Sequence, residues 1–115
     1  MKKEGPLYED SQLKVTLLQD FEGNVVSGED HELHITSSES RYIIQRGILA
    51  QIAGTSRDRL PDLLDRLHPL MLYDLEKNNL TPDSIGVACC QAYMEEQRRF
   101  ELWNKQNEEL IYESH

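Results

Sequence analysis

The sequence predicts an α+β fold in which an N-terminal antiparallel meander of two or three strands packs on three helices, the last one long. Residues 13–36 contain stretches that alternate apolar and polar residues, separated by turn residues. After residue 36 the apolar residues recur at helical spacing. At 115 residues the chain suits one compact domain. We therefore expect a single domain over 1–115, with a loose arm over 1–12, the meander over 13–36 and a helical part over 37–113.

The meander is predicted from three alternating or β-branched stretches. Leu13–Gln19 alternates for most of its length and is rich in residues that favour strands. Phe21–Asn24 supplies the turn of a hairpin, whose returning strand begins at Val25. We expect a second turn over Ser27–Asp30, after which His31–Thr36 alternates again.

The first helix is predicted over residues 37–53. Thr36 and Glu39 have the spacing of a capping box, in which each side chain accepts a hydrogen bond from the other residue's backbone amide. Gly54 suits the position just after the end of the helix. The apolar stripe at every fourth position consists of Ile44, Ile48 and Ile52.

Residues 34–46 carry the one family resemblance in the chain. The segment His34-Ile35-Thr36-Ser37-Ser38-Glu39-Ser40-Arg41-Tyr42-Ile43-Ile44-Gln45-Arg46 resembles the strand-to-helix transition of small uncharacterised proteins of temperate enterobacterial phages. The resemblance covers 13 of the 115 residues and transfers no functional residue. It implies an origin in a phage or other mobile element, and it implies no mechanism.

Two further helices are predicted after Gly54. The first spans residues 58–77, where Pro69 removes a backbone hydrogen bond and should cause either a kink or a split. Because the apolar spacing continues across the proline, we expect a kink. The last helix is predicted to begin after Thr81, with Pro82 in its first position, and to continue to about Glu113.

The second half of this last helix is mostly charged, and a seam of residues spaced three and four apart, interrupted at Glu96, runs along the helix from Cys89. Such a seam suits a helix that projects from the domain and packs on a second copy or on a partner, with Asn107 fixing the register. The alternative is a seam that folds back onto the meander. The seam residues are Cys89, Tyr93, Phe100, Trp103, Asn107 and Leu110.

Charge is concentrated at the two ends of the chain. The 21 acidic and 12 basic residues give a net charge of −9. Residues 1–39 hold nine acids and three bases, residues 40–94 are neutral, and residues 95–115 hold six acids and three bases. This excess argues against a general binder of nucleic acid or of anionic membranes, and it predicts an acidic face if the two ends meet. The alternative is a merely solubilising surface.

The cysteines and the N-terminus indicate a cytoplasmic protein. Cys89 and Cys90 are adjacent, which disfavours a disulfide between them, and we expect reduced thiols with one in the core and one at its boundary. No apolar run approaches the roughly 18 residues of a membrane span. The charged opening at Met1–Pro6 is not followed by the apolar stretch of a signal peptide.

We predict no metal, no cofactor and no enzymatic activity. The best metal candidate contains His31 and His34, but residues three apart on a strand point to opposite faces, and no further His or Cys has ligand spacing. Serines at a helix start, such as those that follow His34, are far more often caps than nucleophiles. The sequence has neither the glycine-flanked serine of a nucleophile elbow nor a glycine-rich phosphate loop.

Protein binding is the function that these observations favour. The leading hypothesis is a small acidic homodimer, paired through the last helix, that inhibits or modulates a basic partner such as a nucleic-acid-handling protein or a toxin. An exposed edge of the meander could also accept a partner strand. Two alternatives stay open: a secretion-type or assembly chaperone with a large apolar groove, and a metal-dependent enzyme in which His31 and His34 converge. The predicted partner-binding residues are Phe100, Trp103, Asn107, Leu110, Glu29, Asp30 and Glu32.

Overall fold

The computed structural model describes the backbone of residues 5–113 and the side chains of residues 5–107. Within these residues the α+β class is confirmed, with a sheet of four strands rather than two or three, and with four helices. In chain order the elements are β1 (Tyr8–Glu9), β2 (Leu13–Gln19), β3 (Val25–Ile35), β4 (Ser40–Gln45), α1 (Arg46–Gly54), α2 (Leu60–Leu67), α3 (Pro69–Lys77) and α4 (Pro82–Glu113).

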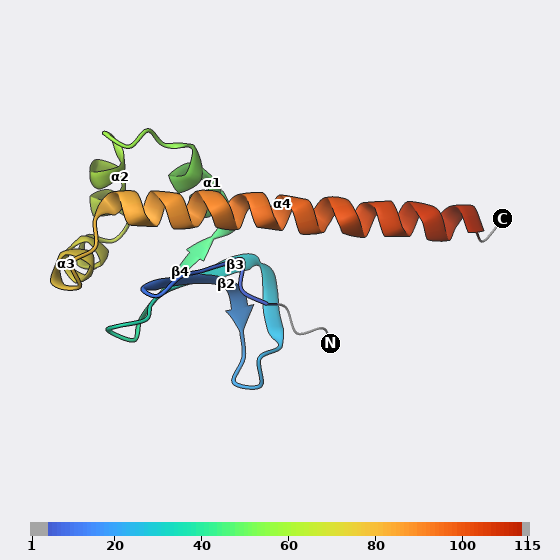
Figure 1. Ribbon diagram of the computed structural model, residues 1–115, viewed down its shortest axis with the longest axis horizontal. Helices are drawn as coiled ribbons and strands as arrows, with labels where there is room; N and C mark the ends of the chain where they lie inside the picture. Colours follow the sequence, from blue (N-terminus) through green and yellow to red (C-terminus); the bar gives the residue numbers. More distant parts are fainter. Residues whose placement is uncertain (1–4, 114–115) are drawn as a thin grey trace.

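The sheet is an antiparallel meander in which strands adjacent in the chain are adjacent in space, in the order β1-β2-β3-β4. The helices lie on one face of this sheet (Figure 1). α4 contacts β1 and β2 on one side and α1 and α2 on the other, so it is the central element of the helical layer. One end of α4 is therefore enclosed by other elements, and Figure 1 shows the other end extending well beyond them.

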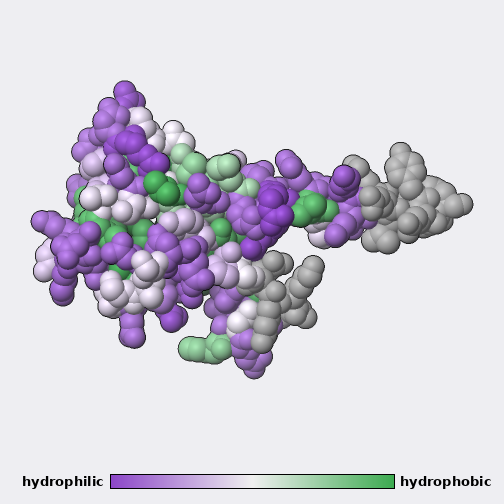
Figure 2. Space-filling model, viewed as in Figure 1, coloured by the Kyte–Doolittle hydropathy of each residue, from purple (hydrophilic) through white to green (hydrophobic). Residues whose placement is uncertain are grey.

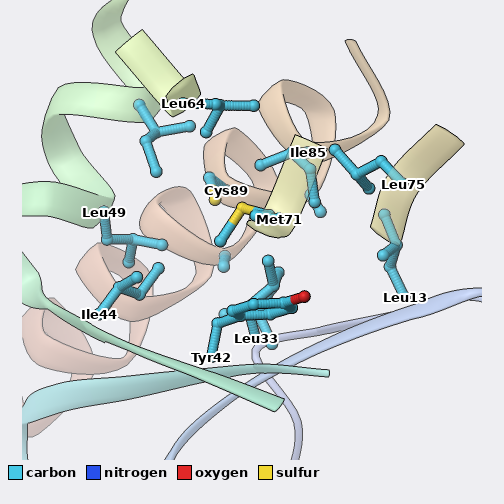
Figure 3. Packing of buried hydrophobic residues seen from close by; sticks show 14 of the residues in the cluster. Leu13, Leu33, Tyr42, Ile44, Leu49, Leu64, Met71, Leu75, Ile85 and Cys89 are labelled. Atoms are coloured by element: carbon cyan, nitrogen blue, oxygen red, sulfur yellow. The ribbon is translucent and has the colours of Figure 1, made fainter. Parts of the chain in front are cut away.

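The core lies between the sheet and the helices. In Leu13–Val15 of β2, His31–Ile35 of β3 and Tyr42–Ile44 of β4, alternate residues point toward the helices, and these are buried and apolar with the exception of His31. In Figure 3 the side chains that rise from the strands pack against those that descend from the helices. The strand residues of this core include Leu13, Val15, Leu33, Ile35, Tyr42 and Ile44, and the helix residues include Leu49, Leu64, Met71, Leu75, Ile85 and Cys89.

The predicted helix over residues 37–53 is wrong in its first half. Residues 36–39 form the turn between β3 and β4, with Glu39 at a φ of 60°. Ser40–Gln45 then pairs with β3 and alternates between exposed and buried side chains, and helix α1 begins only at Arg46. The capping-box pattern was outweighed because a strand lets Tyr42 and Ile44 enter the core together while the backbone of β3 gains a second partner.

The N-terminal arm is not loose over the residues that the structure describes. Leu7 is buried, and its N–H donates to the carbonyl of Val15 at 2.8 Å, which places β1 beside β2. The carboxylate of Asp10 accepts hydrogen bonds from the backbone amides of Gln12 and Leu13, both at 2.7 Å. This side-chain cap closes the turn from β1 to β2.

The first hairpin forms as predicted, but the second predicted turn does not. The carboxylate of Asp20 accepts the amides of Glu22 and Asn24, both at 2.9 Å, and thereby orders the first turn. β3 continues from Val25 to Ile35 without a break. The register of its pairing with β2 shifts, however: Leu17 pairs with His31, whereas Leu18 pairs with Ser27. Residues 28–30 are therefore accommodated as a bulge in one long strand.

The predicted second helix is divided rather than kinked. α2 ends at Leu67, and His68 has φ −161° and ψ 88°, which is extended backbone. Proline disfavours a helical conformation of the residue before it, so the helix restarts at Pro69 as α3. The predicted limits of the last helix, Pro82 and Glu113, are confirmed.

Candidate functional site

The projecting half of α4 is the first candidate site. At 1.5 Å per residue the 32 residues of α4 are about 48 Å long, in a molecule whose longest extent is 57 Å. Figure 1 shows that the C-terminal half of α4 extends beyond the sheet and the other helices, so the seam does not fold back onto the meander. Figure 2 shows an apolar patch on this projection, surrounded by hydrophilic surface.

The seam changes character along α4. Cys89 is fully buried and Tyr93 packs against the core, whereas Phe100 and Trp103 are each 58% exposed. The rings of Phe100 and Trp103 stack, with centroids 6.3 Å apart and planes inclined by 21°. Two stacked aromatic rings on a projecting helix form an apolar surface that a partner can cover.

The last two predicted seam residues have less defined surroundings. Asn107 is half-buried and lies one turn beyond Trp103. Leu110 belongs to α4, but its side chain lies outside the described residues. The seam that the structure describes in side-chain detail therefore ends at Asn107.

The three predicted acidic residues do not lie together. Glu29 and Asp30 are in the bulge of β3, beside Arg46 at the start of α1. Glu32 instead lies on the sheet face away from the helices, where Arg41 approaches its carboxylate to 3.5 Å. Only Glu29 and Asp30 are thus placed near the helical layer.

Arg46 connects this bulge with α4. Its guanidinium donates to the carbonyl of Gly28 and, at 3.2 Å, to the carboxylate of Glu96. Glu96 is one helical turn before Phe100, so the acidic bulge lies near the start of the projecting seam. The sequence alone could not reveal this proximity, because the bulge, Arg46 and Glu96 are far apart in the chain.

The N-terminal segment meets the C-terminal part of α4 through Arg99. Arg99 donates to the carbonyls of Gly5 and Pro6, both at 3.1 Å. Glu95 accepts hydrogen bonds from Arg98 and Arg99, which lower the pKa of its carboxyl to about 2. At this contact the charge of Glu95 is therefore balanced by arginines.

A buried polar pair joins the sheet to α4. His31 is fully buried, and its Nε2 lies 2.6 Å from a carboxylate oxygen of Glu96. Burial opposes ionisation of Glu96, but the hydrogen bond from His31 and the charge of Arg46 outweigh it and hold the pKa of Glu96 below its ordinary value. His31 Nδ1 has no hydrogen-bond partner within the described residues. The pairing of Glu96 with buried His31 explains why a charged residue occupies this position of the mostly apolar seam.

The two histidines lie on opposite faces of the sheet, as their spacing predicts. His31 faces the helices, whereas His34 pairs across the sheet with Lys14 and Arg41 on the other face. Burial and the charges of these two neighbours lower the pKa of His34. The convergence that a metal-dependent enzyme would require is absent, and the described residues contain no group of three or more possible ligands arranged for a metal.

The adjacent cysteines occupy the two predicted environments. Cys89 is fully buried. This burial, with a smaller electrostatic contribution from Cys90, raises the pKa of the Cys89 thiol to about 12. Cys90 is half-buried, and both thiols are free. A high pKa disfavours the reactive thiolate, in keeping with the position of Cys89 in the core.

A second polar network was missed at the sequence level because it depends on β4. The hydroxyl of Tyr42 donates to Asp74 on α3 at 2.6 Å, and burial together with this bond raises the pKa of Tyr42 to about 12. The ring of Tyr42 also meets His68 edge-on, with centroids 4.8 Å apart. These contacts hold β4 against α3. The period-two placement of Tyr42 and Ile44 is the sequence signal that could have revealed the strand.

Comparison with protein-family models, curated proteins and solved structures gives no match for this chain. A search of the described residues for a helix with the length and apolar character of a membrane span also finds none. The function is therefore argued from the surface features themselves, chiefly the exposed aromatic pair of α4 and the acidic bulge beside its base.

Proposed function

We propose that the chain is a small acidic protein-binding protein without enzymatic activity, which inhibits or modulates a partner carrying a basic surface. The observation that supports this most strongly is the stacked pair of Phe100 and Trp103, exposed on the part of α4 that extends beyond the domain. Aromatic residues are enriched among the anchors of protein interfaces, because they bury a large area at low entropic cost. A helix presented in this way offers exposed side chains that a partner can cover.

The occupant that we propose for this helix is a second copy of the chain. The spacing of three and four residues between Phe100, Trp103 and Asn107 is that of a coiled-coil seam. In a parallel pair each of these residues lies opposite its counterpart, and a polar Asn107 at one such position favours a dimer in a single register. The rest of the surface then remains available for the second partner.

The partner of the dimer is proposed to carry a basic surface. The net charge of −9 raises the rate of association with a positively charged protein. Near the base of the projecting helix, Glu29, Asp30 and Glu96 face a single arginine, Arg46, which leaves a local excess of negative charge. A nucleic-acid-handling protein or a toxin has the required charge, and the resemblance of residues 34–46 to phage proteins fits an inhibitor of such a host or competitor protein.

Self-association is tested by light scattering on the full chain. We expect a dimer for the wild type and a monomer for the double variant Phe100→Ser with Trp103→Ser. Phe21→Ser is the matched control, because Phe21 is a fully exposed aromatic residue at the tip of the first hairpin. A wild type that stays monomeric well above micromolar concentration, or a control that dissociates like the double variant, contradicts the proposed dimer.

The basic partner is tested by affinity capture from host cells at low and high salt, followed by mass spectrometry. We expect capture of a protein with a basic surface, and we expect salt to weaken it because screening reduces the attraction between opposite charges. Glu29→Lys should weaken capture, whereas Glu22→Lys changes the net charge equally at the hairpin tip and should weaken it less. Capture that is insensitive to salt and to Glu29→Lys contradicts the electrostatic part of the proposal.

A further inference from the structure

β4 forms an open edge of the sheet. In an antiparallel ladder, alternate residues direct both N–H and C=O to the same neighbouring strand. The N–H of Thr36 donates to the carbonyl of Gln12 at 2.9 Å, so the even-numbered residues at this end of β3 face β2 and the odd-numbered ones face β4. The residues of β4 that pair with the odd-numbered set are Ser40, Tyr42 and Ile44.

The other residues of β4 therefore direct their backbone groups away from the sheet. Arg41 and Ile43 each present an N–H and a C=O at the edge, and Gln45 presents its N–H while its C=O begins α1. Among the described residues no backbone group pairs with these from outside the sheet. Their side chains are also exposed, with Ile43 at 65%. An unpaired row of donors and acceptors remains on this strand.

The opposite edge of the sheet is protected and β4 is not. β1 has only two residues, and it is followed by the turn that Asp10 closes. β4 has six residues, with neither proline nor lysine, and with an exposed isoleucine at its centre. Natural sheets normally block such an edge with a charge, a proline or a bulge. Of these devices β4 carries only one charge, Arg41, which is paired with Glu32 on the face away from the helices, so the strand is available for pairing.

An apolar groove lies beside this edge. It has a volume of about 350 Å³ and separates β4 and α1 from α2 and α3. Successive side chains of a strand point to opposite faces of the sheet, so a strand added to β4 would direct every second side chain toward the helical layer and into this groove. Its lining residues include Ile44, Ile48, Ile52, Leu64, Leu67 and Met71.

Acidic residues at one end of the groove indicate the charge that the bound segment should carry there. Asp30 is part of the groove wall and also borders the neighbouring hollow that contains Glu29. Arg46, the base in that hollow, already binds Glu96. At the other end of β4, Arg41 lies on the opposite face of the sheet from the groove and is paired with Glu32. A lysine or arginine of the occupant therefore finds an acidic environment at the Asp30 end.

A second copy of the chain does not fit this groove through its own β4. In a symmetric pair of β4 strands, the side chains directed toward the helical layers are Tyr42 and Ile44, and both are only 9% exposed because they fill the core of their own molecule. An extended segment with free side chains can instead place them in the groove. The observations therefore favour a different polypeptide.

We propose that the edge of β4 binds an extended segment of another protein as a fifth strand, with alternate apolar side chains in the groove and a basic residue beside Asp30. The backbone groups of Arg41, Ile43 and Gln45 supply the hydrogen bonds of the added ladder, and Ile48 and Leu67, the partly exposed apolar residues of the groove, contact its side chains. This site is separate from the aromatic seam of α4, and it goes beyond the function proposed above.

The test is selection of random nine-residue peptides, displayed on phage, against the immobilised full chain. We expect the enriched peptides to carry apolar residues at alternate positions and a lysine or arginine near one end. The strongest peptide, made synthetically, should protect the amides of Arg41, Ile43 and Gln45 from hydrogen exchange. Asp30→Asn should weaken its binding, and replacing its basic residue by glutamate should do the same.

Two pairs of variants localise the binding. Ile43→Pro removes an outward N–H and leaves the pairing with β3 in place, since edge strands tolerate proline, whereas Ile43→Thr keeps the N–H. We expect about tenfold weaker binding or more for the proline variant, from loss of a ladder hydrogen bond and of strand fit, and little change for threonine. Leu67→Glu places a charge in the groove, and Leu70→Glu, an exposed position outside it, is the control.

Three results would overturn the proposal. The first is a selection that enriches no alternating sequence. The second is a selected peptide that binds Leu67→Glu and Leu70→Glu equally well, which shows that the groove is not used. The third is a wild-type dimer that Ile43→Pro dissociates in the absence of peptide, which shows that a second copy covers the edge. Because none of these readouts uses Phe100 or Trp103, a failure of the α4 seam would be recognised separately.

Discussion

The two halves of α4 have the same backbone conformation but different surroundings. In the first half Ile85, Ala88 and Ala92 are fully buried between the sheet and the other helices. In the second half Phe100 and Trp103 are each 58% exposed. The change occurs around Glu96, which faces both His31 of the sheet and Arg46 of α1. A continuous helix can thus serve the core at one end and present a surface at the other, since its neighbours decide the role of each turn.

The largest expected effect is the loss of an aliphatic side chain from the buried half. Ile85→Ala should lower the free energy of unfolding by about 2–5 kcal/mol, because it leaves a cavity in a region that is fully enclosed. Leu102→Ala on the projecting half should change it by less than about 0.5 kcal/mol. Urea unfolding followed by circular dichroism measures both values. Equal losses for the two variants would show that the projecting half is also enclosed.

The next effect concerns the junction between the halves. Glu96→Ala leaves His31 Nε2 buried without its acceptor, and we expect a loss of about 1–3 kcal/mol in the free energy of unfolding. Glu101→Ala, an exposed acid just over one turn further along, should have little effect. Equal stability of Glu96→Ala and Glu101→Ala would show that the pairing of Glu96 with His31 does not contribute to folding.

The stability that Glu96 contributes at this junction should also depend on pH. A carboxylate whose pKa is lowered in the folded state adds stability above its unfolded pKa, and this stability is lost as the pH falls through the folded pKa. The wild type should therefore lose stability relative to Glu96→Gln as the pH drops below about 4.5, the ordinary value for glutamate. Urea unfolding of both proteins at a series of pH values measures the difference, in which carboxyls common to both cancel. A difference that stays constant in this range would show that the Glu96 charge is not coupled to folding.

The smallest expected effect is a difference in reactivity between the two adjacent thiols in the buried half of α4. Cys89 is fully buried with a raised pKa, whereas Cys90 is half-buried. Under native conditions a thiol reagent should modify Cys90 first, and Cys89 should react only as fast as the protein opens. Cys90→Ser should abolish the fast phase and leave stability nearly unchanged. A fast phase that survives in Cys90→Ser would place Cys89 nearer the surface than the structure does.

The parts of the fold that could be predicted from the sequence are those with local causes. The start of α4 follows from Thr81 and Pro82, and the first hairpin follows from the turn residues near Gly23, which adopts a φ of 85°. The opposite orientations of His31 and His34 follow from the period of a strand. The candidate seam of α4 was also identifiable, because helical spacing places Phe100 and Trp103 on neighbouring turns.

The parts that could not be predicted depend on partners distant in the chain. Thr36 and Glu39 satisfy a capping box, yet they form a turn because Ser40–Gln45 pairs with β3. Leu7 was predicted to lie in a loose arm because the residues around it have no strong preference for a strand. The strand β1 beside it forms because β2 supplies the pairing partner, which the local sequence does not reveal. Pro69 indicated a break in the helix, but whether it would be a kink or a split depended on how α2 and α3 each pack on the core.

The α+β class, the start of the last helix and the residue types of its seam can be read from local periodicity and helix-start signals in the chain. The projection of the second half of α4, the pairing of Glu96 with buried His31 and the open edge of β4 beside an apolar groove became evident only in the folded molecule. Burial and backbone pairing each require two segments, so the residues of one segment do not indicate which other segment will pack against it.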